Sequence, residues 1–294
     1  MTEMTTPVVV EAGASRLARW LPRPTPKNLI TLLITLILVV GEWSYGIVGG
    51  YRKLGLTLGT CVLTELVLSW FLLGRMPFLQ SAYITGVSLT MLVRPQAGLV
   101  WPFVVGAALS IGSKYVLRYK GNHLWNPSNL GLAALLLLAP TRVALLSHEF
   151  GNAIGANAVI WSVGILIAAR ARILHVSLTY AASFALLAAA RSAIVGTPLL
   201  AELAPLTGPM YQLLVFFMLT DPRTTVRAKR GRVVTVASIA VVEALIRLGN
   251  DFDMAWAAPF APAPPILALA IVGPIAMALD LRRRSVRGGQ NPTV

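Results

Sequence analysis

The chain consists of long apolar runs separated by short polar links, and this alternation restricts the folds open to it. Ten runs can be delimited, most of them close to the roughly 20 residues that span the hydrocarbon core of a bilayer as a helix. Only 12% of the residues are charged, about half the share found in soluble domains. We therefore predict an all-α polytopic membrane protein. The predicted segments are 28–48, 54–73, 81–93, 97–117, 127–140, 153–171, 174–195, 207–220, 232–249 and 262–280.

The lysines and arginines fall mainly on one side of a ten-segment topology. Of these 25 residues, 19 lie in the two tails and in every second loop, and the other six lie in the remaining loops. Because cytoplasmic loops are enriched in positive charge, we predict ten spans in the cytoplasmic membrane with both termini in the cytoplasm. The net charge of +14 is scattered over the loops and forms no continuous stripe for nucleic acid, so the bilayer is the expected partner.

The ten segments divide into two sets of five, which would have opposite orientations in the membrane. We predict a basic tail 1–27, a first repeat 28–140, a connecting loop 141–152, a second repeat 153–280 and a basic tail 281–294. The third and eighth segments are too short for a roughly 30 Å core at about 1.5 Å per residue, and both end alike, at Pro95 and Pro222. Paired short segments indicate broken helices around a site in the middle of the membrane. The alternative is that proline simply ends each helix at the interface.

Two carboxylates lie inside apolar runs. A charge at the middle of a membrane costs about 2.5–3.5 kcal/mol on insertion scales, so each requires a partner, a proton or a hydrated cavity. Glu243 has Arg247 one helical turn ahead and can form a local ion pair, whereas Glu65 has no such neighbour. Both are candidates for ion or proton coupling. The alternative for each is a structural ion pair or hydrogen bond.

The most polar stretch runs from Gly112 to Gly131. Lys114 and Arg118, four residues apart, are expected to close one helix, and Asn126 precedes a proline that opens the next. A helix N-terminus flanked by cations can bind an anion such as phosphate or a lipid headgroup. The alternative is a set of cytoplasmic basic residues beside an Asn N-cap. Three scattered histidines and a single cysteine provide no metal-ligand spacing and no intrachain disulfide.

Three passages resemble the membrane subunit shared by Rnf complexes and sodium-translocating NADH:quinone reductases, the RnfD/NqrB family. They are Tyr83-Ile84-Thr85-Gly86 through Arg94-Pro95, Lys114 through Asn126-Pro127 and Gly131, and Phe217 through Pro222 with Arg223-Thr224-Thr225. The resemblance covers most of residues 28–280. It implies an inverted-repeat fold like that of urea and ammonium channels, with flavin in the membrane subunit and electrons passed across it. The run Asn126-Pro127-Ser128-Asn129-Leu130-Gly131 is similar, more closely still, to a divergent branch found in enediyne-type biosynthetic gene clusters.

One departure from the family concerns the cofactor. Members with covalent FMN attach it to the threonine of a Ser-Gly-Ala-Thr motif after the fifth span, whereas this chain has Pro140-Thr141-Arg142 there and no such motif. We therefore expect no covalent FMN, and non-covalent FMN or riboflavin is the cofactor that the resemblance implies. Lys114 and Arg118 would then hold an anionic group, and Thr220 and Asp221 would bond ring or ribityl groups. The full set of candidate ligand-binding residues is Thr85, Arg94, Lys114, Arg118, Asn126, Asn129, Thr220, Asp221 and Thr224.

The resemblance implies a subunit of a membrane electron-transport system that translocates ions, with other membrane redox subunits as partners. One alternative is a transporter or exporter in which the same site binds a solute and Glu65 or Glu243 couples protons. Another is a membrane scaffold for biosynthetic enzymes of the enediyne type. The sequence contains no nucleotide-binding fingerprint, no nucleophile paired with a base and no metal-binding motif, so independent catalysis is not expected.

Overall fold

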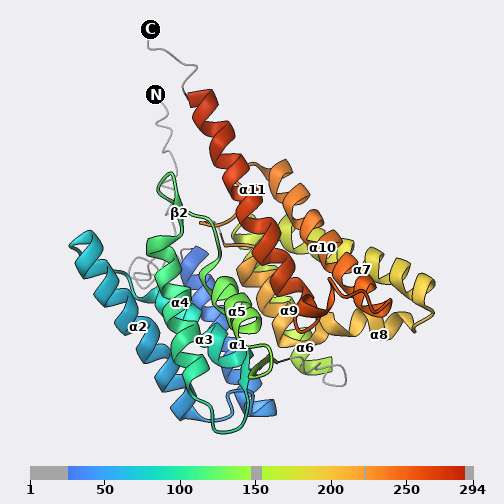
Figure 1. Ribbon diagram of the computed structural model, residues 1–294, viewed down its shortest axis with the longest axis horizontal. Helices are drawn as coiled ribbons and strands as arrows, with labels where there is room; N and C mark the ends of the chain where they lie inside the picture. Colours follow the sequence, from blue (N-terminus) through green and yellow to red (C-terminus); the bar gives the residue numbers. More distant parts are fainter. Residues whose placement is uncertain (1–25, 147–153, 222, 289–294) are drawn as a thin grey trace, which may run out of the picture.

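The computed structural model describes residues 26–146, 154–221 and 223–288, which form a bundle of helices with two small pairs of strands (Figure 1). The helices of the first half are α1 (Pro26–Tyr45), α2 (Tyr51–Leu73), α3 (Gln80–Leu92), α4 (Trp101–Val116) and α5 (Pro127–Leu138). Those of the second half are α6 (Ile154–Arg170), α7 (Leu174–Val195), α8 (Leu199–Leu203), η2 (Ala204–Thr207), α9 (Pro209–Leu213), η3 (Leu214–Met218), α10 (Lys229–Asp251), η4 (Ala258–Phe260) and α11 (Pro264–Gly288). The strands are β1 (Val93–Pro95), β2 (Arg118–Tyr119), β3 (Asn122–His123) and β4 (Val143–Leu145).

Within the described ranges, five helices are long and apolar enough to cross a membrane, namely α1, α2, α7, α10 and α11. The segment from α8 to η3 adds a sixth if its two parts, bent by 60°, are counted as one broken span. Large apolar side chains such as Trp43, Phe71 and Leu186 are exposed on these helices, a pattern that suits lipid and not water. The prediction of an all-α protein with several helices of membrane-spanning length is therefore confirmed. The other predicted spans correspond to the shorter helices α3, α4, α5 and α6 and to the broken segment.

The two short segments predicted from the sequence, α3 and α9–η3, form the centre of the bundle. Every residue from 85 to 92 and from 209 to 219 is buried, and α3 packs against α9. The α9–η3 segment is mostly apolar, as expected for a helix covered on all sides, whereas α3 also contains serine and threonine residues along one side. Gly86 allows α3 to approach α2, because a Cβ at this position would lie 2.7 Å from a side-chain atom of Leu58.

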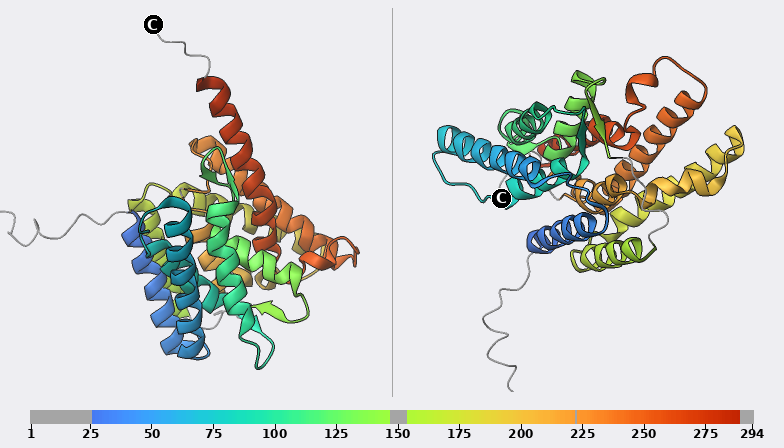
Figure 2. Two further views of the ribbon diagram at one scale, coloured as in Figure 1. Left: turned by 60° about the vertical axis from the view of Figure 1, so that its left-hand side comes forward. Right: turned by 90° about the horizontal axis from the view of Figure 1, so that it is seen from below.

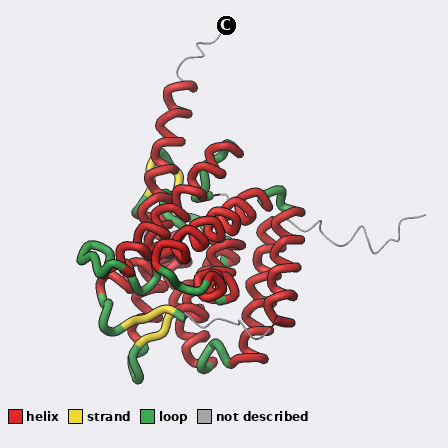
Figure 3. Tube along the Cα trace, turned by 90° about the vertical axis from the view of Figure 1, so that its right-hand side faces the viewer, coloured by secondary structure: helices red, strands yellow, loops and turns green. Residues whose placement is uncertain are grey.

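The strands were not predicted, because two or three residues have no periodicity that the sequence could reveal. Val93 of β1 lies opposite Leu145 of β4, and Arg118 of β2 lies opposite His123 of β3, both pairs antiparallel. The two strand pairs lie at opposite ends of the helices (Figure 3). The C-terminal part of α11 extends past its neighbours at the end where β2 and β3 lie (Figures 1 and 2). Residues 1–25 and 289–294 of the two predicted tails, including the termini placed in the cytoplasm, and residues 147–152 of the predicted connecting loop lie outside the described residues.

Candidate functional site

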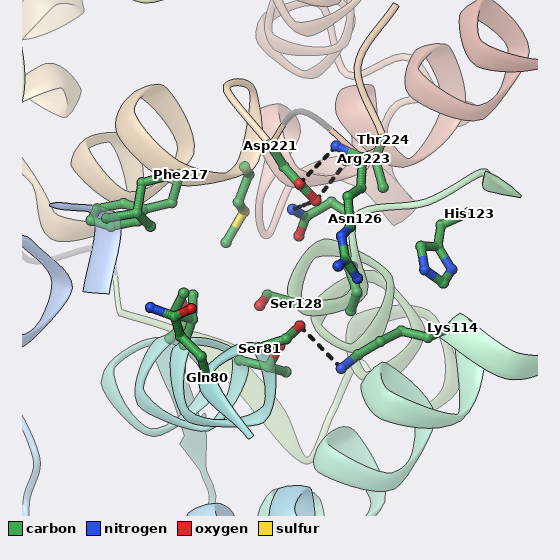
Figure 4. A pocket seen from close by; sticks show the side chains of 16 residues that line it. Gln80, Ser81, Lys114, His123, Asn126, Ser128, Phe217, Asp221, Arg223 and Thr224 are labelled. Atoms are coloured by element: carbon green, nitrogen blue, oxygen red, sulfur yellow. Dashed lines mark hydrogen bonds between the residues drawn. The ribbon is translucent and has the colours of Figure 1, made fainter. Parts of the chain in front are cut away.

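A cavity with both polar and apolar side chains in its wall, which we call the first cavity, lies between the N-terminal parts of α3 and α5 and the end of η3 (Figure 4). Its volume is about 110 Å³, enough for several water molecules. Lys114 and Ser81 lie on one side of it, and Asp221 and Asn126 lie on the other. The remaining lining residues are Ile30, Gln80, Ile84, Thr85, Ser88, His123, Pro127, Ser128, Phe217, Met218, Arg223 and Thr224.

Asn126 places the N-terminus of α5 at the wall of the first cavity. Its side-chain Oδ1 accepts a hydrogen bond from the backbone N–H of Asn129 at 3.1 Å, which is a normal N-cap, and Pro127 occupies the first helical position. The amide Nδ2 of Asn126 donates to the carboxylate of Asp221 at 3.3 Å. One side chain therefore caps a helix of the first half of the chain and bonds to the end of a helix in the second half.

Asp221 lies on the same side of the first cavity as Asn126, three residues after the end of the π-helix η3. Its carboxylate accepts from Thr224 Oγ1 at 3.0 Å and from the backbone N–H of Arg223 at 3.0 Å, in addition to Asn126. A π-helical turn inside a helix is uncommon and is often found at functional sites. Here Phe217 of this turn and Asp221 shortly after it both line the first cavity.

The charged wall of the first cavity is an ion pair between two helices. The ammonium group of Lys114 on α4 donates to the carboxylate of Glu65 on α2 and, at 3.1 Å, to Ser81 Oγ on α3. Tyr115 donates a further hydrogen bond of 3.2 Å to the same carboxylate. Both charged side chains are more than nine-tenths buried. Each charge thus supplies the partner that the other requires in an apolar surrounding.

A second cavity of about 290 Å³ lies at the C-terminal ends of α7 and α10. Arg191 on α7 is ion-paired with Asp251 on α10, where Nη2 and Oδ1 are 2.7 Å apart, and with Glu202 on α8. The lining residues are Leu146, Arg191, Pro205, Gly208, Met210, Tyr211, Arg247, Asn250, Asp251, Ala261, Pro262 and Pro264.

Behind the wall of the second cavity, Glu243 is completely buried and is held by three donors. Its carboxylate accepts from the hydroxyls of Tyr180 and Tyr211 and from Arg247 Nε at 3.0 Å. Arg247 also donates to the Tyr211 hydroxyl. The local ion pair that the four-residue spacing predicted is therefore present, and it belongs to a larger cluster that joins α7, α9 and α10.

The two cavities lie at opposite ends of the central pair α3 and α9–η3, which run antiparallel. α3 begins at the first cavity with Gln80 and ends at Leu92, whose carbonyl accepts from the N–H of Leu146 (2.8 Å) in the wall of the second cavity. The α9–η3 segment begins at the second cavity with Met210 and reaches the first with Phe217. The middle parts of both segments are buried. Each cavity is thus closed toward the other by the packed core.

Five of the nine candidate ligand-binding residues line the first cavity, and four do not. The five are Thr85, Lys114, Asn126, Asp221 and Thr224. Arg94 lies at the far end of α3 and donates to the carbonyls of Ile47, Thr90 and Val93. Asn129 donates to the carbonyl of Ile266 at 2.8 Å, in the contact between α5 and α11. Thr220 donates to the carbonyl of Phe216 at 2.6 Å.

Arg118 also lies away from the cavity. The predicted helix that would place it above Lys114 ends at Val116, and Arg118 begins the turn of β2 and β3, where it donates to the carbonyl of Gly121 at 2.9 Å.

Several residues of the two cavities were not predicted. Ser81 and Gln80 are ordinary polar residues at a helix start, and Tyr180 and Tyr211 are single aromatics in apolar runs, so the sequence offers no signal for them. Arg191 is the exception, because an arginine near the end of an apolar run requires a partner. The sequence shows the need but does not identify Asp251, 60 positions away, as that partner.

His123 lies beside the first cavity in the turn of β2 and β3. Burial lowers the pKa of its imidazole below the ordinary value of 6.5, the nearby Arg118 and Arg223 lower it further, and Asp221 opposes this shift. A neutral imidazole therefore adds no positive charge to the cavity at neutral pH.

The first cavity does not fit the flavin that the family resemblance implies. Its volume is below the roughly 300 Å³ at which pockets begin to enclose drug-sized ligands. The cation expected to hold the anionic group, Lys114, is neutralised by Glu65, and Arg118 lies outside the cavity. The hydroxyl of Thr220 is bonded to the backbone. The cavity instead has room only for a small molecule, which could bond to the polar side chains of its wall.

No model of a protein family matches this chain, and none of the curated proteins is significantly similar to it in sequence. The resemblance to the RnfD/NqrB family therefore stays a prediction that rests on the three passages.

Proposed function

We propose that this protein is an inverted-repeat membrane transport protein, in which the two cavities are the two ends of a route for a small polar solute. By the distribution of basic residues, the first cavity faces the cytoplasm and the second faces the opposite side of the cytoplasmic membrane. The observation on which this proposal rests is the placement of two cavities, each with charged side chains in its wall, at opposite ends of the antiparallel pair α3 and α9–η3.

The packing of the helices supports the inverted repeat. In the first half α2 packs on α4 and α4 on α5, and in the second half α7 packs on α10 and α10 on α11 in the same order. The contacts between the halves join corresponding helices, namely α1 with α6, α3 with α9, and α5 with α11. In a ten-span topology, the short helices would complete the repeats around the two broken segments.

The ion pairs of the two cavities support a transport role. In each cavity a cation at the wall, Lys114 or Arg247, is bound to a carboxylate buried behind it, Glu65 or Glu243. Charged groups inside a membrane are costly and commonly mark the pathways of ions, protons or solutes. A solute or proton that competes for Glu65 or Lys114 would loosen the contact between α2 and α4. One that competes for Glu243 would loosen the cluster that joins α7, α9 and α10, so binding could be coupled to opening at either cavity.

A second candidate is the electron-transport subunit that the resemblance implies. It is favoured by one observation, because all three passages of the resemblance contribute to the wall of the first cavity, through Thr85, through Lys114 with Asn126, and through Asp221 with Thr224. If the protein is such a subunit, binding of a redox partner or of the cofactor would have to enlarge the first cavity.

Cysteine accessibility tests the transport proposal without knowledge of the solute. In a Cys61→Ser background, Ser81→Cys reports on the first cavity and Met210→Cys on the second, while Ser110→Cys in the buried face of α4 is the control. A membrane-impermeant maleimide should label Ser81→Cys only from the cytoplasmic side and Met210→Cys only from the other side. Labelling of both from one side would contradict the proposal, and labelling of neither would favour a scaffold.

An absorption and fluorescence spectrum of the detergent-purified protein separates transport from electron transfer. The transport proposal predicts no flavin absorption or fluorescence. Flavin that is released by acid denaturation would favour the electron-transport candidate.

A further inference from the structure

A groove between α10 and α11 lies outside the two cavities and has no role in the proposed route. It has a volume of about 840 Å³ and runs between the N-terminal half of α10 and the C-terminal half of α11. Its walls are apolar, and Val234, Ile275 and Leu279 are each about half exposed. Gly231 and Ala276 also line the groove, and their small side chains leave space in it. Arg230 and Arg283 stand at its end.

Within the described part of the chain, the two arginines at the end of the groove have no anionic partner. Asp280, the carboxylate nearest to them along the groove, is ion-paired with Arg284 and also accepts from the backbone N–H of Arg227 at 3.4 Å. No ion pair with a carboxylate is formed by Arg230 or by Arg283 in these ranges. The end of the groove is therefore positively charged and open to an anion.

The groove has two chemically different parts, an apolar channel and a positively charged end. From Arg230 to Ser238 it extends along α10 for about 12 Å, at about 1.5 Å per residue, with apolar walls of hydrocarbon character. Its charged end lies at the side of the bundle that also has the basic residues Arg227, Lys229 and Arg232. An amphipathic molecule with an apolar tail and an anionic head satisfies both parts.

A second copy of this chain is a poorer occupant. A symmetric contact would bring the same surface patch of two copies together. Arg230 and Arg283 of each copy would then approach those of the other without a carboxylate between them, and like charges in contact are repelled.

We propose that this groove binds an anionic phospholipid, with its acyl chains between α10 and α11 and its phosphate between Arg230 and Arg283. Basic pockets between membrane helices at the cytoplasmic side recognise anionic lipid headgroups in this way. The lipid would fill the space between the two helices and stabilise their contact.

Binding of defined lipids to the delipidated, detergent-solubilised full chain tests the proposal. Phosphatidylglycerol should bind roughly thirtyfold more tightly than phosphatidylcholine with the same acyl chains, because its headgroup has a net negative charge that attracts both arginines, whereas the choline ammonium of phosphatidylcholine offsets the charge of its phosphate. The double variant Arg230→Gln, Arg283→Gln should lose this preference. The matched control Arg52→Gln, Arg142→Gln removes the same charge from exposed positions at the other end of the bundle and should keep it.

The variant Ala276→Phe fills the groove without changing any charge. It should weaken binding of both lipids while leaving the preference for phosphatidylglycerol in place. Equal affinity of the wild-type chain for the two lipids would overturn the proposal, and so would an equal loss of preference in the Arg52→Gln, Arg142→Gln control. A change of cysteine labelling in the two cavities is not expected in any of these variants, so this test is independent of the transport proposal.

Discussion

Glu65 on α2 and Lys114 on α4 form a buried ion pair at the wall of the first cavity, although 49 positions separate them in the chain. The pair joins two helices of the same half and leaves one face of the ammonium group toward Ser81 on α3. It therefore both stabilises the helix packing and sets the charge of the cavity.

Breaking this pair from one side should destabilise the protein strongly. Either Glu65→Leu or Lys114→Met alone leaves a buried charge without its partner, at an expected cost of about 3–5 kcal/mol. The double variant removes both charges and should be much closer to wild type. Thermal unfolding in detergent measures all four proteins. Additive losses in the double variant would show that the two residues are not coupled.

The two tyrosines that donate to Glu243 should differ in effect. Tyr180→Phe removes one hydrogen bond to a charged group, which costs about 1.5–3 kcal/mol, whereas Tyr211→Phe removes the bonds to both Glu243 and Arg247 and should cost more. Of the two, Tyr211 also lines the second cavity and bonds to Arg247. Thermal midpoints should fall in both variants, whereas labelling of Met210→Cys should increase only with Tyr211→Phe. A similar increase with Tyr180→Phe would assign the change to general loosening of the helices.

Gly131 should tolerate no side chain. A Cβ at this position in α5 would lie 1.9 Å from Ser110 Oγ and 2.7 Å from the carbonyl oxygen of Gly106, so Gly131→Ala forces α5 away from α4. Overpacking of this kind typically costs about 1–3 kcal/mol. Gly112→Ala in α4 is the matched control, because nothing lies within 4 Å of a Cβ there. Its thermal midpoint should stay at or above that of wild type, and an unchanged midpoint of Gly131→Ala would contradict the packing.

Acidification should destabilise the turn that contains His123. Since the pKa of this imidazole is lower in the folded protein than its ordinary value of 6.5, the native state prefers the neutral form. The associated stability is present above pH 6.5 and is lost as the pH falls below it. His123→Gln should reduce the fall in thermal midpoint between about pH 7.5 and about pH 5.5, where histidine changes charge. An equal fall in both proteins would mean that other groups cause it.

Local sequence determined the parts of this protein that depend on neighbouring residues. The apolar runs predicted helices of membrane length, the breaks at Pro95 and Pro222 predicted two short segments, and the pair Asn126-Pro127 predicted a capped helix start. The Glu243 and Arg247 pair was also predictable, because four residues form about one helical turn. Each of these features is fixed by backbone geometry within a few positions.

Only the tertiary structure decided which helices pack against each other and which residues along them come into contact. The partner of Glu65, the ion pairs of Arg191 and the second cavity all depend on contacts between residues far apart in the chain. The same is true of Arg94, a predicted ligand-binding residue that lies at the end of α3 away from the first cavity. The periodicity of apolar residues specifies which face of a helix is buried. It does not specify which helix covers that face, because the hydrophobic effect is non-directional and any apolar surface can serve as the partner. That choice follows from how all the helices pack together.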